Sequence, residues 1–184
     1  MTQSLYQFCQ NWIAKAAAYN DDTLANHFDK FTSLYVTFNA LYMDVMVQLV
    51  AQGKEIPKDF KDKKAATDYV IKYLRSKHFI SNLLNDQQST DDLNAICNII
   101  HDEHFNIILD WGEPQRLLDL KLLEGLRSTS TQEKGVAILS LLYHVRCNMF
   151  HGHKGFEDRQ SQLLGPVNRL LRKVVTITFN KLNE

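Results

Sequence analysis

The chain contains few of the residues that interrupt helices or cross-link segments. Its 184 residues include only 7 glycines, 3 prolines and 3 cysteines. Scarce glycine and proline predict long helices, because these two residues are the usual helix breakers. Cys9, Cys97 and Cys147 are odd in number, and no two lie at CxxC spacing. This pattern argues against a disulfide framework or a structural zinc site and is typical of a reducing compartment.

The chain also lacks an excess of either charge. Lys+Arg 21 balances Asp+Glu 21, which gives a formal net charge of +0. A neutral protein does not bind nucleic acid through bulk charge, so contact with RNA would require a local positive field or one created by pairing two protomers. The start of the chain has no signal-peptide pattern, and no uninterrupted apolar run reaches the ~20 residues of a bilayer span. We therefore expect a soluble cytoplasmic protein with no membrane partner.

Apolar residues recur at helical spacing along most of the chain. This pattern predicts an all-α helical bundle with a long second helix, in a single domain of residues 1–184. The central helix should be residues 132–150, since its middle is apolar on nearly every side. Further helices are expected at about residues 3–19, 24–52, 65–75, 115–126 and 156–182, with helical spacing also at residues 93–100 and 105–109.

The segments between these helices are less regular. Residues 54–63 are charged and contain Pro57, which predicts an exposed loop, and residues 76–92 are only weakly patterned. Residues 111–114 break the helical pattern, and Gly165-Pro166 should kink or split the last helix. Residues 176–179 are β-branched in part, but without a partner strand they are expected to be helical.

The segment VRCNMFHGHKG, residues 145–155, carries the most chemistry. Arg146 and His151 are five positions apart, which places them about 140° apart on an unbroken helix. They converge if the helix ends near Phe150 and His151 lies in the cap, as the following Gly152 favours. Two such helices packed across a dimer axis would also bring the pairs together.

An arginine and a histidine are suited to cleaving RNA without a metal. The ribose 2′-oxygen attacks its own phosphate, His151 takes the hydroxyl proton, and Arg146 offsets the charge of the phosphorane. Asn148 would hold a ribose or phosphate oxygen, or cap the helix. A structural interpretation is also open, because arginine near a helix C-terminus complements the macrodipole and His-Gly is an ordinary helix end.

Two stretches resemble a known family. Residues 141–154, LLYHVRCNMFHGHK, are similar to the R-x4-6-H signature of HEPN domains (higher eukaryotes and prokaryotes nucleotide-binding). Residues 31–42, FTSLYVTFNALY, resemble the "FxxFNALY" helix of some bacterial HEPN proteins. The family's commoner pattern has Asn directly after the Arg, whereas this chain has Cys147 at that position.

The resemblance implies a homodimeric helical bundle whose paired Arg and His residues meet at the interface. Active members are metal-independent endoribonucleases, which need no cofactor, in toxin–antitoxin, abortive-infection and CRISPR-associated defence systems. Carried over by motif, the catalytic residues are Arg146 and His151, with Asn148 as an accessory. The expected partners are RNA, a second copy of the chain and an antitoxin or defence protein. The alternative is a catalytically silent HEPN-like module that mediates dimerisation or binds protein or nucleotide, as an adaptor or immunity subunit.

Three further residues are candidates for substrate binding. Asn39 either reaches the Arg/His cleft or is a buried Asn satisfied inside the bundle. His153 and Lys154 either contact RNA phosphates or belong to an exposed turn.

The spacing of the remaining reactive residues gives less support to other kinds of chemistry. A metal site would use His144, His151 and His153, but no carboxylate near them is fixed by spacing. A second candidate, His101 with His104, lacks the HExxH spacing. Cys147 is a nucleophile in one interpretation and a small buried hydrophobe in the other. The aromatic side chains, including Trp12 and Trp111, are expected to be core residues.

Overall fold

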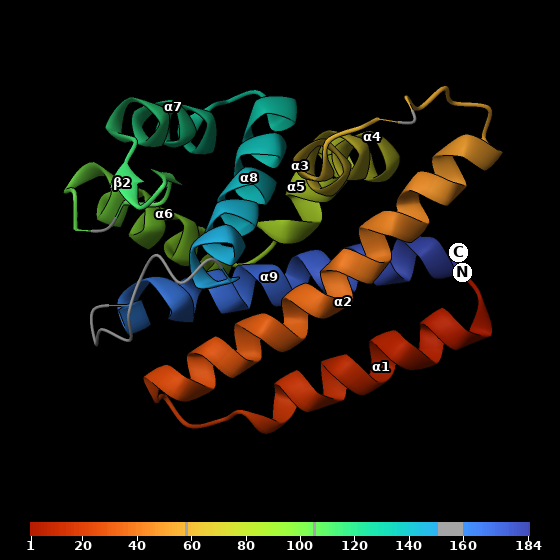
Figure 1. The fold of residues 1–184 in the computed structure, drawn as a ribbon, viewed down its shortest axis with the longest axis horizontal. Helices are drawn as coiled ribbons and strands as arrows, with labels where there is room; N and C mark the ends of the chain where they lie inside the picture. The colour runs from red at the N-terminus through yellow and green to blue at the C-terminus, as the bar shows by residue number, and fades with distance from the viewer. Residues whose placement is uncertain (58, 105, 151–159) are drawn as a thin grey trace.

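The computed structural model describes residues 1–57, 59–104, 106–150 and 160–184, with the backbone alone for Phe150. The fold is all-α, as the sequence predicts, with one small hairpin (Figure 1). In chain order the elements are α1 (Gln3–Ala18), α2 (Leu24–Ala51), α3 (Asp62–Lys64), the π-helical turn η1 (Ala65–Tyr69), α4 (Val70–Leu74), α5 (Ser76–Leu83), α6 (Gln87–His101), β1 (Leu109–Asp110), β2 (Glu113–Pro114), α7 (Arg116–Arg127), α8 (Thr131–Phe150) and α9 (Gln160–Asn183).

The long helices α1, α2 and α9 pack side by side, with α2 contacting both of the others (Figure 1). On the other side of α9, the shorter helices α5 and α7 pack against α8, and α6 packs against α9 and α7. The two ends of the chain meet, since the Met1 amino group donates to the Leu182 carbonyl at 3.2 Å. Buried apolar side chains from both halves form one cluster.

Local sequence explains the bounds of α2. The Thr23 side chain accepts a hydrogen bond from the Asn26 N–H at 3.3 Å and caps the start of the helix. Gly53, with φ +76°, ends it by taking a left-handed conformation that favours glycine. Between these ends, buried aromatic residues recur every three or four positions and face the core: Phe31, Tyr35, Phe38 and Tyr42.

Among the described segments, α2 is the helix long and apolar enough to span a membrane by length and composition. Half of its apolar stretch is buried inside the bundle, where it packs on α1 and α9. Its hydropathy is accounted for by its place in the core of a folded domain.

Two expectations from the weakly patterned regions were wrong or incomplete. Residues 76–92 contain a complete helix, α5, and the first turn of α6. Only Phe79 and Leu83 of α5 are buried, so its apolar stripe is too short to be recognised by period alone. Residues 107–108 are not helical, because α6 ends at His101 and β1 follows at Leu109.

The β1–β2 hairpin corrects a third expectation. Its turn consists of Trp111 and Gly112, both with positive φ, and the Trp111 side chain is 93% exposed. Trp111 is therefore not a core residue, since the turn holds it out of the bundle. Pro166 also departs from the prediction of a split, because it lies inside the continuous helix α9.

Candidate functional site around Arg146

Arg146 lies one turn before the end of α8 and is partly buried between aromatic rings. Its guanidinium carbon is 5.9 Å from the centre of the Tyr143 ring and 6.0 Å from the centre of the Tyr35 ring. Nη1 also lies 3.9 Å from the Cys147 sulfur. Stacking of this kind is favourable for a guanidinium, which is planar and weakly hydrated.

The two rings come from different helices. Tyr35 belongs to α2 and Tyr143 to α8, so Arg146 sits where residues 31–42 and residues 141–154 approach each other in space. The sequence places these stretches about a hundred positions apart, and packing brings them into contact. This convergence is the central geometric feature of the candidate site.

A carboxylate joins the same cluster from α3. The Tyr42 hydroxyl donates to Asp62 Oδ1 at 2.8 Å, and the Asp62 charge is one of the causes that raise the pKa of Tyr143. Tyr35 completes the group, with a fully buried hydroxyl that has no partner among the described residues. We call Tyr35, Tyr42, Tyr143 and Asp62 the tyrosine cluster.

The phenols of the tyrosine cluster stay neutral and the neighbouring Arg146 stays charged. Burial, with smaller contributions from neighbouring charges, raises the pKa of Tyr35 and Tyr42 well above the ordinary range. Burial and the nearby Cys147 and Asp62 groups raise the pKa of Tyr143 to about 12. Burial lowers the pKa of Arg146, but the Cys147 thiol and the two tyrosines raise it by more, so its net shift is upward. Near neutral pH the site therefore presents one fixed cation beside hydroxyl donors.

Asn39 lies at the edge of this cluster. It is exposed, and its side-chain amide is a hydrogen-bond partner of the Tyr42 hydroxyl. Of the two alternatives for Asn39, the one in which it is buried inside the bundle is therefore contradicted. Its contact with substrate stays a prediction.

Asn148 points into the protein. Its side chain is buried, and Nδ2 donates to the Ile107 carbonyl at 2.8 Å. The Ile107 N–H in turn donates to the buried Asp119 carboxylate of α7 at 3.2 Å. Asn148 thus ties α8 to the segment before β1, and a substrate contact of its amide remains a prediction.

Replacing Asn148 by Ala should lower the free energy of unfolding by about 1–3 kcal/mol, because it leaves the buried Ile107 carbonyl without this donor. Urea unfolding measures the change, with Asn180→Ala on the exposed face of α9 as the matched control. Equal stability of the two variants would contradict the assigned role.

His144 lies two residues before Arg146 and so points about 200° away around α8. It lines a groove of about 510 Å³ together with Lys63, Ser140 and Lys121. Lys63 Nζ lies 2.9 Å from His144 Nε2, so the imidazole accepts from the ammonium in its neutral form. Burial first, and the Lys63 charge second, lower the pKa of His144 to about 4.

This shift predicts acid sensitivity. Because the folded-state pKa lies below the unfolded value of 6.5, the unfolded chain binds the proton more readily between these values. The contribution of neutral His144 to the free energy of unfolding is therefore present above pH 6.5 and is lost as the pH falls toward 4. The wild-type protein should lose unfolding free energy as the pH falls from 7 to 5. In His144→Gln this loss should be smaller by roughly 1 kcal/mol, after allowance for solvent screening. If the unfolding free energy of His144→Gln depends on pH as it does in the wild type and in the exposed-site control His78→Gln, this prediction is contradicted.

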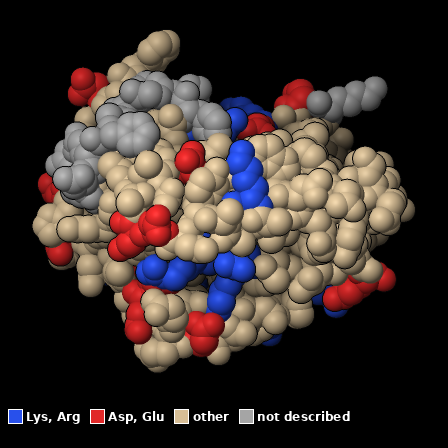
Figure 2. Space-filling model, turned by 90° about the horizontal axis from the view of Figure 1, so that it is seen from below, with Lys and Arg blue, Asp and Glu red and all other residues tan. Residues whose placement is uncertain are grey.

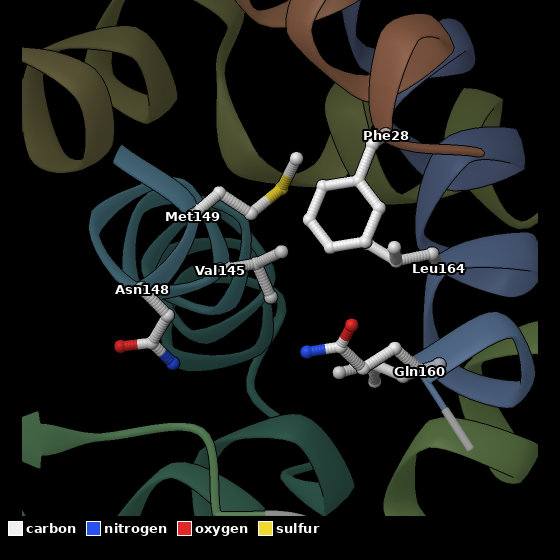
Figure 3. A pocket seen from close by; sticks show the side chains of 7 residues that line it. Phe28, Val145, Asn148, Met149, Gln160 and Leu164 are labelled. Atoms are coloured by element: carbon white, nitrogen blue, oxygen red, sulfur yellow. The ribbon is translucent and has the colours of Figure 1, made fainter. Parts of the chain in front are cut away.

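A small cavity lies under the end of α8. Figure 3 shows Phe28 of α2 and Leu164 of α9 facing Val145 and Met149 of α8 across it. Its volume is about 20 Å³, enough for about one water molecule. This void is a packing feature and is too small for a nucleotide.

The surface charge is dispersed. On the face drawn in Figure 2, Lys and Arg side chains lie close to Asp and Glu side chains, and most of the surface is neither. Two cations of α9 are paired with carboxylates, Arg169 with Asp92 and Lys173 with Asp86. A broad basic surface is absent from the face shown, in keeping with the formal net charge of +0.

The remaining predicted site residues, His151, His153 and Lys154, lie outside the residues that the structure describes. Within the described ranges, no group of three or more His, Cys, Asp or Glu side chains is arranged to hold a metal ion. His101 pairs with Asp102 at 2.8 Å, and both are exposed. Cys147 is half-buried beside Arg146.

Comparison with known proteins gives no relative: no family model, no curated protein and no solved structure matches the chain. The fold class therefore rests on the structure itself, and the functional assignment rests on the residues around Arg146.

The tyrosine cluster was not anticipated from the sequence, where the aromatic residues of positions 28–42 are expected to be core. A signal was present, because Tyr35, Asn39 and Tyr42 recur at i, i+4 and i+7 and so place polar atoms on one face of an apolar helix. Asp62 had no such signal, since its contact with Tyr42 joins residues from separate elements.

Proposed function

We propose that the chain is a metal-independent endoribonuclease of the HEPN type, acting as a homodimer in a bacterial toxin–antitoxin or antiphage defence system. The observation that carries the proposal is the position of Arg146, held between Tyr35 and Tyr143 five positions before His151. The sequence resemblance supports the pairing of Arg146 with His151 as the catalytic residues.

The proposed reaction is transesterification within the RNA strand. His151 takes the proton of a ribose 2′-hydroxyl as the 2′-oxygen bonds to the adjacent phosphorus. Arg146 offsets the charge on the phosphorane oxygens through charge-assisted hydrogen bonds. The bond to the 5′-oxygen then breaks, and that oxygen receives a proton from a protonated histidine, supplied by the partner protomer. The products are a 2′,3′-cyclic phosphate and a 5′-hydroxyl.

Dimerisation would supply the local positive charge that a single neutral chain lacks. Two copies of Arg146 in one cleft would double the local positive charge without a basic surface elsewhere. His153, Lys154 and Asn39 are the proposed contacts for the remaining phosphate and sugar oxygens. A protein partner, an antitoxin or a defence component, would control access to this cleft in the cytoplasm.

The test is cleavage of end-labelled RNA by wild type and by His151→Ala, both in excess EDTA. Wild type should cleave, and His151→Ala should lose the activity, whereas His78→Ala, a change at an exposed histidine of α5, should retain it. Activity that disappears with EDTA would replace this proposal by metal-dependent hydrolysis. Absence of cleavage by all three folded proteins would favour the catalytically silent binding module.

A further inference from the structure

Three large apolar side chains around the start of α7 are exposed to solvent. Trp111, in the turn between β1 and β2, is 93% exposed, and Leu117 and Leu118 in the first turn of α7 are 76% and 44% exposed. Tryptophan is highly buried on average, and large exposed apolar surface on a soluble protein is typical of an interaction site. Trp111 is also of the residue type that contributes most to protein–protein interfaces, where a few aromatic side chains carry most of the binding energy.

The β1–β2 hairpin holds Trp111 in this position at a cost in free energy. Its φ of +50° lies in the left-handed region, which a bulky residue rarely adopts. Asp110 and Glu113 lie directly opposite each other across the two strands, and like charges at such positions destabilise a hairpin. The hairpin therefore presents an indole between two carboxylates, and a cationic surface that met them would relieve their repulsion.

A groove on the same chain is large enough for an indole and has an apolar lining. It is the groove of about 510 Å³ that His144 lines, and sites of about 300–1,000 Å³ accommodate ligands larger than one tryptophan side chain. Its apolar residues come from the segment before β1 and from α7 and α8: Ile108, Leu118, Leu122, Val136 and Ala137. Trp111 does not fill this groove within its own chain, since its side chain is exposed. The groove is thus open to a side chain from another molecule.

The charges of the groove complement those of the hairpin. Its two ammonium groups, on Lys63 and Lys121, form no ion pair with a carboxylate among the residues that the structure describes. The groove also contains Asp68 and Glu133, but each of these carboxylates accepts a hydrogen bond from a neighbouring hydroxyl, at 2.9 Å and 2.6 Å. The lysines are therefore the charges available to an incoming acidic segment.

We propose that this face is an interface between two copies of the chain, in which Trp111 of each copy inserts into the groove of the other. The carboxylates beside Trp111 then face Lys63 and Lys121 of the second copy. The hairpin and the groove adjoin on one chain, because Ile108 lines the groove and its carbonyl accepts from the Gln115 N–H at 2.9 Å at the base of the hairpin. A two-fold axis beside them therefore makes both insertions at once, and the contact closes as a pair instead of propagating.

This interface is separate from the one that would join two Arg146 sites, and it does not rest on the proposed function. His144 lines the groove and lies about 200° around α8 from Arg146. One chain can therefore use both surfaces. With both in use the assembly is larger than a dimer, and with the Trp111 surface alone it is a dimer.

The first experiment follows the Trp111 indole itself. The chain contains 2 tryptophans, so in Trp12→Phe the tryptophan fluorescence comes from Trp111 alone. As the concentration of Trp12→Phe is raised, the emission should shift to the blue and acrylamide should quench it less, because the indole leaves water for the apolar groove. Trp111→Ala, in which Trp12 is the remaining tryptophan, is the control and should show neither change.

The second experiment measures self-association by sedimentation velocity over a range of protein concentrations. Trp111→Ala should raise the dissociation constant of the dimer formed through this surface about 30-fold or more, as truncation of a central aromatic residue does in other interfaces. Val47→Ala, at an exposed apolar residue of α2, is the matched control and should leave the dissociation constant unchanged. Circular dichroism shows that each variant is folded.

Charge reversal tests the two-fold arrangement. Lys63→Glu combined with Lys121→Glu reverses the groove. Asp110→Lys combined with Glu113→Lys reverses the hairpin. Each double variant should fail to associate through this surface, because like charges then meet, whereas an equal mixture of the two should associate, since each groove is opposite in charge to the hairpin of the other variant. Lys72→Glu, at an exposed lysine of α4 outside the groove, should behave as wild type.

Trp111 emission that stays unshifted at every concentration would overturn the proposal, as would self-association that Trp111→Ala leaves unchanged. Failure of the mixed charge variants to associate would exclude the two-fold arrangement. A blue shift that appears only when phosphatidylglycerol vesicles are added would also overturn the proposal and assign the exposed indole to a lipid surface. The outcome is independent of RNA cleavage: a folded wild type that pairs through Trp111 and cuts no RNA would keep this interface and end the proposed nuclease function.

Discussion

Arg146→Ala should reduce RNA cleavage by about 10³-fold or more while the protein stays folded. The guanidinium is the fixed cation of the candidate site, and removing one preorganised group that stabilises transition-state charge costs losses of this size. Most of the loss should appear in kcat, since the charge on the phosphorane exceeds that on the bound substrate. Single-turnover cleavage at saturating protein measures it.

Arg146→Lys should recover only part of this activity. Lysine keeps the charge but lacks the planar fork that contacts two phosphate oxygens and stacks on the tyrosine rings. Arg172→Ala, a change at an exposed arginine of α9, is the matched control and should leave cleavage intact. Circular dichroism and thermal unfolding show whether each variant is folded. Full activity of folded Arg146→Ala would remove Arg146 from the catalytic assignment, and loss of folding would assign it to stability instead.

Phe38→Ala should be among the most destabilising single substitutions in the chain. Phe38 is fully buried in α2, and its ring packs edge-on against Tyr35 at 5.8 Å and Tyr42 at 5.4 Å between ring centres. Truncating a core phenylalanine removes buried apolar area and leaves a cavity, which costs about 3–5 kcal/mol. For a protein of this size the melting temperature should fall by roughly 10 °C.

Val47→Ala is the control on the same helix, because Val47 is 62% exposed and its truncation should cost less than about 0.5 kcal/mol. Urea unfolding of both variants gives the two free energies. A difference below about 1 kcal/mol between the two free energies would mean that the buried aromatic residues of α2 are not the centre of the core. Since Phe38 separates Tyr35 from Tyr42, the same substitution should also weaken the support of Arg146.

The long helices were predictable because their burial follows the period of their apolar residues. In α2 the core positions recur at three- and four-residue spacing from Phe31 to Leu49, and Thr23 and Gly53 mark where the helix begins and ends. In α8 the middle is apolar on nearly every side, with buried residues from Ala137 to Val145. The signal is weaker in α5, where two buried residues in eight give too little pattern. Trp111 was misplaced for a different reason, because its exposure depends on the hairpin turn and not on its hydrophobicity.

The candidate site was predictable only in part. The chemical character of Arg146 is visible in the sequence, but its neighbours are set by tertiary contacts between α2, α3 and α8. Asn148 shows that polarity alone does not predict a role in substrate binding. Although it lies close to Arg146 in the sequence, its side chain donates a hydrogen bond to the Ile107 carbonyl. Sequence patterns identify reactive residue types, while packing decides which of them face one another.

Cleavage of two matched oligonucleotides tests the central claim most directly. One is an RNA cut by the protein, and the other carries a single 2′-deoxy nucleotide on the 5′ side of the cleaved bond, with both incubated in excess EDTA. The transesterification proposed for Arg146 and His151 predicts that the RNA is cut to a 2′,3′-cyclic phosphate and a 5′-hydroxyl, and that the deoxy substrate is not cut. Equal cleavage of both substrates, or products with a 5′-phosphate, would contradict the account.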